Sequence, residues 1–139
     1  MQTRVRSPLG AAVALVIAAA PAAAVTRDQF VVRTSGDLVT LCSAREGEPL
    51  YEAAIGFCHG FMVGAYRYHE ATLGAGAGPK LFCMPEPAPT RAQAIGRWLD
   101  WVKADPARLA QPAVESPFRF LAEAYPCPGD AGATKGGPR

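Results

Sequence analysis

The sequence predicts a small all-α domain of four to five helices, closed by two disulfides. Apolar residues recur at three- and four-residue steps through residues 50–73 and again through 90–104, which is the spacing of one helix face. Capping residues and prolines separate these stretches from their neighbours. The four cysteines are an even number in a short chain, which is typical of disulfide bonding. A length of 139 residues suits a single domain.

Residues 1–24 have the composition of an export signal. Two arginines and no acid come before the apolar run at residues 11–20, Pro21 interrupts that run, and residues 22–24 are the small residues that a signal peptidase requires. A membrane anchor is the alternative, but a spanning helix needs about 20 apolar residues. We therefore expect a cleaved signal peptide, a periplasmic protein and no stable membrane anchor.

The charge of the remaining 115 residues is balanced. Of the 14 Lys and Arg residues, Arg4 and Arg6 lie in the signal, and none of the 12 Asp and Glu residues does, so 12 charges of each sign remain. A nucleic-acid binder normally has a clear basic excess, and an anionic membrane surface attracts a polybasic patch. Neither class of partner is expected.

The first half of the predicted domain, residues 25–127, contains an arm and two helices. Residues 25–34 are expected to form a short extended arm. A helix follows, with its N-cap within residues 35–37 and its end by residues 47–49. The longest helix covers residues 50–73, where the apolar periodicity lasts for nearly six turns.

Three glycines, Gly56, Gly60 and Gly64, lie four residues apart along this longest helix. Each costs about 0.5–1 kcal/mol relative to Ala in a helix interior. Close approach of another backbone would account for them. That backbone could belong to another helix of the same domain, which we favour, or to the same stripe in a second copy of a homodimer.

A glycine-rich loop at residues 74–80 leads to the second half of the domain. Thr90 and Gln93 have the spacing of a capping box, so a third helix begins there and continues to about Ala104. Its apolar face includes Trp98.

A short helical turn at residues 105–110 and a last helix complete the domain. The last helix begins either at Pro112 or at a Ser116 cap, and the sequence does not decide between them. Its expected apolar face consists of Phe118, Leu121, Ala122 and Tyr125. Residues 128–139 contain no large apolar residue and are expected to be a disordered tail.

The expected order of helices predicts which cysteines pair. A short turn places the first two helices side by side, which brings Cys42 next to Cys58. An antiparallel hairpin of the last two helices brings together Cys83, before one of them, and Cys127, after the other. No C-x-x-C pair is present, so a zinc ribbon, a thioredoxin-type redox pair and a c-type haem site are all disfavoured.

No catalytic, metal or cofactor site is expected. Cys58 lies beside His59, but adjacent helical residues point about 100° apart, and an exported cysteine of this kind is expected to be oxidised. His59 and His69 are ten residues apart, which is not a chelating spacing on one helix. The acidic residues on the predicted polar faces are expected to be solvated; they are Glu52, Glu70, Asp100 and Glu123.

The order of several short motifs resembles that of the Rap/Tai family of small periplasmic immunity proteins. The motifs are Thr34-Ser35-Gly36-Asp37-Leu38 leading to Cys42, Phe57-Cys58-His59-Gly60-Phe61-Met62-Val63-Gly64-Ala65, Phe82-Cys83-Met84-Pro85, Trp98-Leu99 and Ala122-Glu123-Ala124-Tyr125-Pro126-Cys127. Together they cover residues 34–127. The resemblance implies a helical fold similar to that of the HdeA acid-stress chaperone.

The resemblance also implies a function. Proteins of this family bind and block cell-wall amidase toxins that are delivered by type VI secretion, and they need no catalytic group or cofactor. Two alternatives remain open: a periplasmic acid-stress chaperone of the HdeA type, and an accessory protein with no toxin partner. Under the immunity hypothesis, the partner-binding residues are expected in and beside the segment 103–112; they are Trp101, Lys103, Asp105, Arg108 and Gln111.

Overall fold

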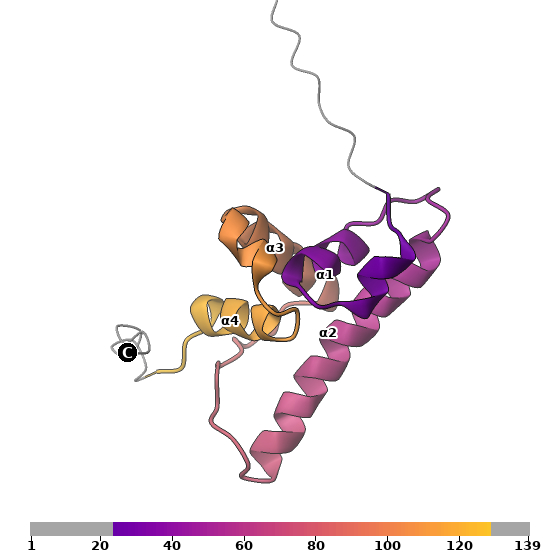
Figure 1. Cartoon of the computed structure of the whole chain (residues 1–139). Coiled ribbons are helices and arrows are strands. Elements are labelled where there is room, and N and C mark those ends of the chain that lie inside the picture. The colour runs from indigo at the N-terminus through magenta and orange to yellow at the C-terminus, as the bar shows by residue number, and fades with distance from the viewer. Residues whose placement is uncertain (1–23, 129–139) are drawn as a thin grey trace, which may run out of the picture.

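The computed structural model describes residues 24–128, and this part of the chain is all-α, as predicted (Figure 1). Its elements, in chain order, are the 3-10 helix η1 (Arg27–Val31), α1 (Ser35–Cys42), α2 (Tyr51–Gly74), α3 (Arg91–Lys103), the 3-10 helix η2 (Pro106–Ala110) and α4 (Glu115–Ala124). The predicted signal peptide and C-terminal tail fall almost wholly outside the described residues, so both stay predictions.

The N-terminal arm is helical, which corrects the prediction of an extended segment over residues 25–34. Its first turn is fixed by Gln29, whose Oε1 accepts hydrogen bonds of 2.7 Å from the backbone N–H and from the hydroxyl of Thr26. Residues 27–31 then form η1, and Phe30 packs edge-on against Phe57 of α2 with 5.6 Å between the ring centroids. Local capping chemistry therefore shapes the arm, while Phe30 attaches it to α2.

Helix α1 is capped by Thr34, one residue before the predicted cap. The Thr34 hydroxyl accepts a 3.3 Å hydrogen bond from the Asp37 N–H, and the Asp37 carboxylate accepts one of 3.0 Å from the Thr34 N–H. This reciprocal pair satisfies two of the donors that a helix N-terminus leaves unpaired. The helix ends at Cys42, earlier than the predicted end near Gly47.

Helix α2 is the longest element, and it begins and ends within one residue of the prediction. Its N-terminal half packs against α1 and η1, whereas its last turns extend past the other helices, and the chain returns from its end through residues 75–90 (Figure 1). The helices formed by residues 24–128 do not include one with the length and apolar composition needed to cross a membrane.

Both predicted disulfides are confirmed. Cys42 and Cys58 join α1 to α2 with a Cα–Cα distance of 5.2 Å, and Cys83 and Cys127 join the segments before α3 and after α4 with a distance of 4.8 Å. Beside the second bond, the Cys83 N–H donates a 2.8 Å hydrogen bond to the carbonyl of Tyr125. One crosslink therefore lies within the first half of the domain, and the other joins the two ends of its second half.

Helix α4 begins at Glu115, which is neither of the two predicted starts. It also crosses α3 instead of forming an antiparallel hairpin with it. Ser116 and Glu123, near opposite ends of α4, accept hydrogen bonds from Trp98 and Trp101, which lie within one turn of α3. The second disulfide joins the segments that flank these two helices, so the predicted pairing is correct although the predicted helix geometry is not.

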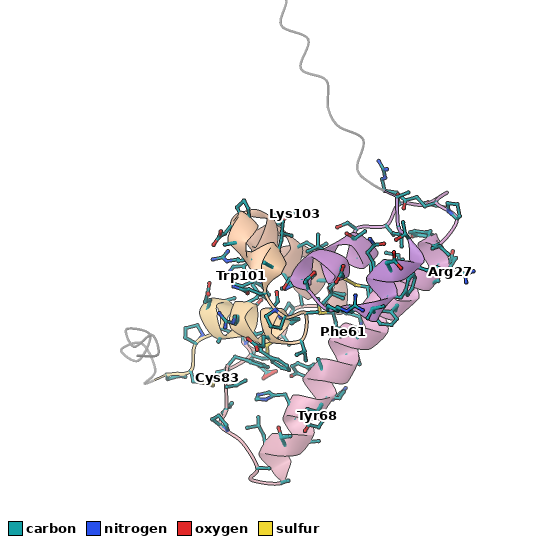
Figure 2. The ribbon with its side chains drawn as sticks, in the orientation of Figure 1. Arg27, Phe61, Tyr68, Cys83, Trp101 and Lys103 are labelled. Atoms are coloured by element: carbon teal, nitrogen blue, oxygen red, sulfur yellow. A yellow bond between two sulfur atoms is a disulfide. The ribbon has the colours of Figure 1, made fainter. Side chains whose placement is uncertain are left out.

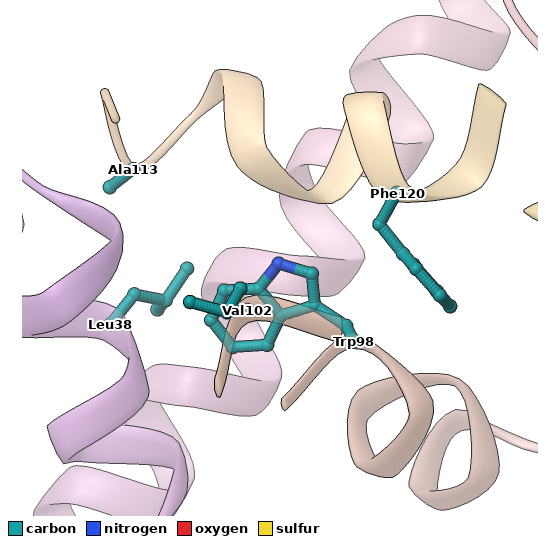
Figure 3. Close-up of a cluster of buried hydrophobic side chains, with 5 residues drawn as sticks. All are labelled: Leu38, Trp98, Val102, Ala113 and Phe120. Carbon is teal, nitrogen blue, oxygen red and sulfur yellow. The ribbon is translucent and has the colours of Figure 1, made fainter. Parts of the chain in front are cut away.

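The core consists of two groups of buried side chains. One group joins α1, α3, α4 and the turn before α4 (Figure 3); its buried members are Leu38, Trp98, Val102, Ala113 and Phe120. The other joins α1, α2 and α3; its buried members are Leu41, Ala54, Cys58 and Ile95. Phe120 is the buried aromatic residue of α4, which corrects the predicted apolar face, because that face omitted it.

The glycine stripe of α2 is exposed, so the predicted close contact with another helix of the same domain is wrong. A Cβ atom added at Gly56, Gly60 or Gly64 would have no atom of the described chain within 4 Å, apart from its own helix backbone and sequence neighbours. Contact with a second copy stays a prediction.

Candidate protein-binding surface

Trp101 and Arg108 form the centre of a polar cluster at the end of α3. The guanidinium carbon of Arg108, on η2, lies 3.9 Å from the centroid of the Trp101 ring, in cation–π contact. Its Nη1 also donates a hydrogen bond of 2.6 Å to the backbone carbonyl of Trp101. The indole also packs on core residue Phe120, with 6.1 Å between the ring centroids. Trp101 is therefore fixed between the core and Arg108.

Two carboxylates complete this cluster. Glu123 of α4 accepts a 2.7 Å hydrogen bond from the Trp101 indole nitrogen, and its Oε2 lies 3.7 Å from Nη2 of Arg108. Asp105 Oδ2 lies 3.8 Å from Nε of Arg108, while its Oδ1 caps η2 by accepting a 3.0 Å hydrogen bond from the Ala107 N–H. We call these four residues, Trp101, Asp105, Arg108 and Glu123, the Trp101 cluster.

The segment between α3 and α4 is also held from its other side by the start of α1. The Gln111 carbonyl accepts hydrogen bonds from the Ser35 N–H, at 2.8 Å, and from the Ser35 hydroxyl, at 3.1 Å. At Gly36 an added Cβ would lie 3.4 Å from the carbonyl oxygen of Leu109, so η2 and α1 are in close contact. Both ends of the segment are therefore attached to the core.

The structure brings three of the five predicted partner-binding residues together, namely Trp101, Asp105 and Arg108. Lys103 is exposed at the end of α3, two residues after Trp101 (Figure 2), and makes no ion pair with the described residues. The backbone carbonyl of Gln111 makes the contact with α1 instead, and its side-chain Oε1 is buried with no hydrogen-bond partner in the described chain. Its position favours a structural role over a partner-binding one.

Glu123 is the member of the cluster that the sequence analysis missed, since it was assigned to the solvated surface. Its distance from Trp101 along the chain is 22 residues, and the contact exists only because α4 crosses α3. The available signal was its position three residues after Phe120, because residues three apart share a helix face, but the predicted apolar face omitted Phe120.

The residues weighed for chemistry have other environments. Cys58 is buried and bonded to Cys42, so it has no free thiol to act as a nucleophile. His69 is buried between Phe82 and Phe118, whereas His59 is only half-buried on α2. Across residues 24–128, no three His, Cys, Asp or Glu side chains are grouped so that they could hold a metal ion.

Comparison with protein families gives one clear result. The model of the family described as Rap1a immunity proteins matches residues 34–127. The match begins at the Thr34 cap of α1 and ends at Cys127, so it includes both disulfides and the whole Trp101 cluster. No curated protein and no solved structure gives a significant match.

Proposed function

The chain belongs to the Rap1a immunity proteins, and from this premise we propose that it binds and blocks a toxin that is a peptidoglycan amidase. The observation that carries the proposal is the extent of the family match, which covers the complete disulfide-closed domain. An immunity protein acts by occupying its toxin, so the function requires a binding surface and no catalytic group.

We place the toxin-binding surface at the Trp101 cluster and Lys103. Arg and Trp are enriched among the residues that contribute most to protein interfaces. Trp101 and Arg108 are already held in one arrangement by Glu123, Asp105 and the core, as the distances above indicate. A surface that is ordered before binding loses less conformational entropy when the partner docks.

The proposed mechanism is obstruction of the amidase active site. The segment 103–112 joins α3 to α4 and is attached to α1 by the Ser35–Gln111 hydrogen bonds. Anchored in this way, it enters the cleft as a rigid wedge and excludes peptidoglycan. Lys103 supplies an exposed positive charge at the edge of this surface for an acidic group on the toxin.

The periplasm is the proposed compartment. Two disulfides form and persist in oxidising compartments, and peptidoglycan, the substrate of the proposed toxin, lies in the same space. Residues 1–24 supply the predicted export signal.

An amidase inhibition assay tests the proposal. Amidases encoded beside the gene are purified, and the release of soluble fragments from peptidoglycan is measured with and without an equimolar amount of the oxidised protein. We expect the protein to suppress this release and to co-elute with the enzyme. Undiminished hydrolysis by every neighbouring amidase, together with no complex, would contradict the proposal.

The same preparation tests the acid-stress alternative. A protein that stays folded and monodisperse near pH 2–3, and that does not suppress the aggregation of client proteins there, is not a chaperone of the HdeA type. Suppression of aggregation at low pH without any amidase inhibition would favour the chaperone hypothesis over ours.

A further inference from the structure

A groove runs along the C-terminal half of α2, on a part of the molecule distinct from the Trp101 cluster. It consists of two neighbouring cavities of about 340 and 260 Å³, which share Tyr66 and Met84 in their walls. The larger cavity lies between α2, the segment before α3, α3 and α4, and its apolar wall includes Met62, Trp98, Phe118 and Leu121. We call the two cavities together the α2 groove.

The wall of the smaller cavity contains a buried polar atom without a partner. His69 is 7% exposed, and its ring lies against Phe82 and Phe118 with centroid distances of 5.0 and 5.5 Å. Its Nε2 is buried and makes no hydrogen bond within the described chain. Leaving such an atom unpaired is unfavourable. A polar group brought in by a ligand would satisfy it.

Positive charge lies along the whole groove. Arg67 and Arg91 line the larger cavity and Lys80 lines the smaller one, whereas Glu70 is the acidic residue in these walls. Glu70 is already paired with Arg67 at 2.7 Å, and neither Lys80 nor Arg91 has an ion-pair partner among the described residues. The chain after residue 24 is neutral, so this excess is local to the groove.

Tyr66 stands where the two cavities meet. Burial raises the pKa of its hydroxyl, and the nearby Glu70 carboxylate raises it further. A tyrosine hydroxyl is protonated at neutral pH in any case, so it is a hydrogen-bond donor at the middle of the groove.

We propose that the α2 groove binds an extended segment of a protein partner in which an apolar side chain is flanked by carboxylates. The apolar side chain enters the larger cavity, and the carboxylates lie against Arg91 and Lys80. A fatty acid would bring one carboxylate, whereas the cations are distributed along both cavities, which suits a peptide with several. This inference rests on the proposed function only in taking the partner to be a protein.

Peptide binding to the oxidised protein, purified from the periplasm, tests the inference. The protein is labelled with ¹³C at the methionine methyl groups and with ¹⁵N in the histidine rings. The probes are nonapeptides with a central Leu, Phe or Met flanked by Asp and Glu, matched peptides with Lys and Arg in those flanks, and dodecanoate. Met62 and Met84 line the groove, and His59, outside it, is the internal reference for His69.

We expect the acidic peptides to shift the Met62, Met84 and His69 signals and to leave His59 unchanged. Lys80→Glu with Arg91→Glu should weaken their binding by about tenfold, because two attractive contacts become repulsive. Arg27→Glu with Arg33→Glu makes the same charge change at exposed residues outside the groove and should have little effect. All four substituted residues are exposed, so both variants should fold.

Three outcomes would overturn the inference: no shift of the Met62 and Met84 signals at millimolar peptide, equal binding of the basic peptides, or binding of dodecanoate alone, which would make the groove a lipid site. None of these results affects amidase inhibition through the Trp101 cluster. Conversely, binding of acidic peptides in the groove without inhibition of any amidase would support this inference and contradict the proposed function.

Discussion

The indole nitrogen of Trp98 donates a 2.9 Å hydrogen bond to the hydroxyl of Ser116, and both side chains are almost completely buried. Trp98 belongs to the core group shared by α1, α3 and α4 (Figure 3). A buried indole N–H needs an acceptor, and Ser116 provides it from the first turn of α4. This bond therefore joins α3 to the first turn of α4, and the same helix pair places Glu123 beside Trp101.

Replacing Ser116 with alanine should destabilise the protein by about 1–3 kcal/mol, because it leaves the buried Trp98 N–H without an acceptor. Urea denaturation of the oxidised protein measures the change. Ser43→Ala is the matched control, since Ser43 is exposed at the end of α1, and it should change the free energy of unfolding by less than about 0.5 kcal/mol. Equal losses in the two variants would argue against the role given to this bond.

Opening either disulfide should cost a large part of the stability of this domain. The crosslinks span 16 and 44 residues along the chain. In the chain-entropy model, such closures stabilise the folded state by about 3 and 4 kcal/mol respectively. The paired variants Cys42→Ala with Cys58→Ala and Cys83→Ala with Cys127→Ala are compared by urea denaturation. A reduced wild-type protein as stable as the oxidised one would refute the expectation.

The helix starts that could be predicted from the sequence are those with a local capping signal. The Thr90–Gln93 box correctly placed the start of α3, and Asp105 correctly placed the start of η2. The same chemistry was overlooked at Thr34, because Ser35 is an equally good capping residue and Asp37 replaces the usual Glu or Gln. The first turn of α4 contains Ser116, whose partner Trp98 lies 18 positions away. No local sequence pattern contains this contact.

Only part of the candidate binding surface could be predicted, because one of its contacts joins residues that are far apart in the sequence. Asp105 and Arg108 are close in sequence, and Trp101 precedes them on the adjoining helix, so proximity along the chain brought them into one hypothesis. Glu123 joins them through the crossing of α3 and α4. Gln111 was included by proximity alone, and its hydrogen bonds lead to α1 instead.

Protonation of Glu48 should lower the stability of the protein at acidic pH. A hydrogen bond from Arg45 holds the pKa of its carboxyl below its ordinary value, and the backbone N–H of Val25 also contributes. A lowered pKa in the folded state stabilises folding above the unfolded value, and this stabilisation is lost as the pH falls through the folded value. Glu48→Gln should therefore lose less stability than the wild type between about pH 5 and pH 2.

The measurement is the urea midpoint of wild type and variant at each pH. Glu46→Gln, at the neighbouring exposed glutamate, is the control. Val25 adds a further comparison, because its nitrogen lies 3.4 Å from Glu48 Oε2 and becomes an α-ammonium group if the signal is cut after Ala24. A chain that begins at Val25 should then depend more strongly on Glu48 than one with extra residues before it. Indistinguishable pH profiles for Glu48→Gln and wild type would contradict this account.

Reversing the charge of Lys103 should weaken the binding of the toxin without changing the fold. Lys103 is exposed at the end of α3, two residues after Trp101, and loss of a charge at the rim of an interface mainly slows association. We expect Lys103→Glu to raise the Kd by about tenfold, measured by surface plasmon resonance at two salt concentrations. Arg27→Glu makes the same charge change far from the cluster (Figure 2) and should leave the Kd unchanged. Equal effects of both variants would show that net charge, not this surface, governs binding.

Replacing Gly60 with alanine should stabilise the protein by about 0.5–1 kcal/mol, because alanine restricts the unfolded chain more and suits a helix interior better. Apart from its own helix backbone and sequence neighbours, no atom of the described chain lies within 4 Å of the added methyl group, so no clash offsets the gain. Gly47 is the control: its surroundings are equally open, but its φ of 91° is strained for any other residue, so Gly47→Ala should destabilise. Urea denaturation separates the two, and gel filtration of the Gly60 variant tests the predicted homodimer. A loss of stability that depends on protein concentration would mean that Gly60 packs against a second copy.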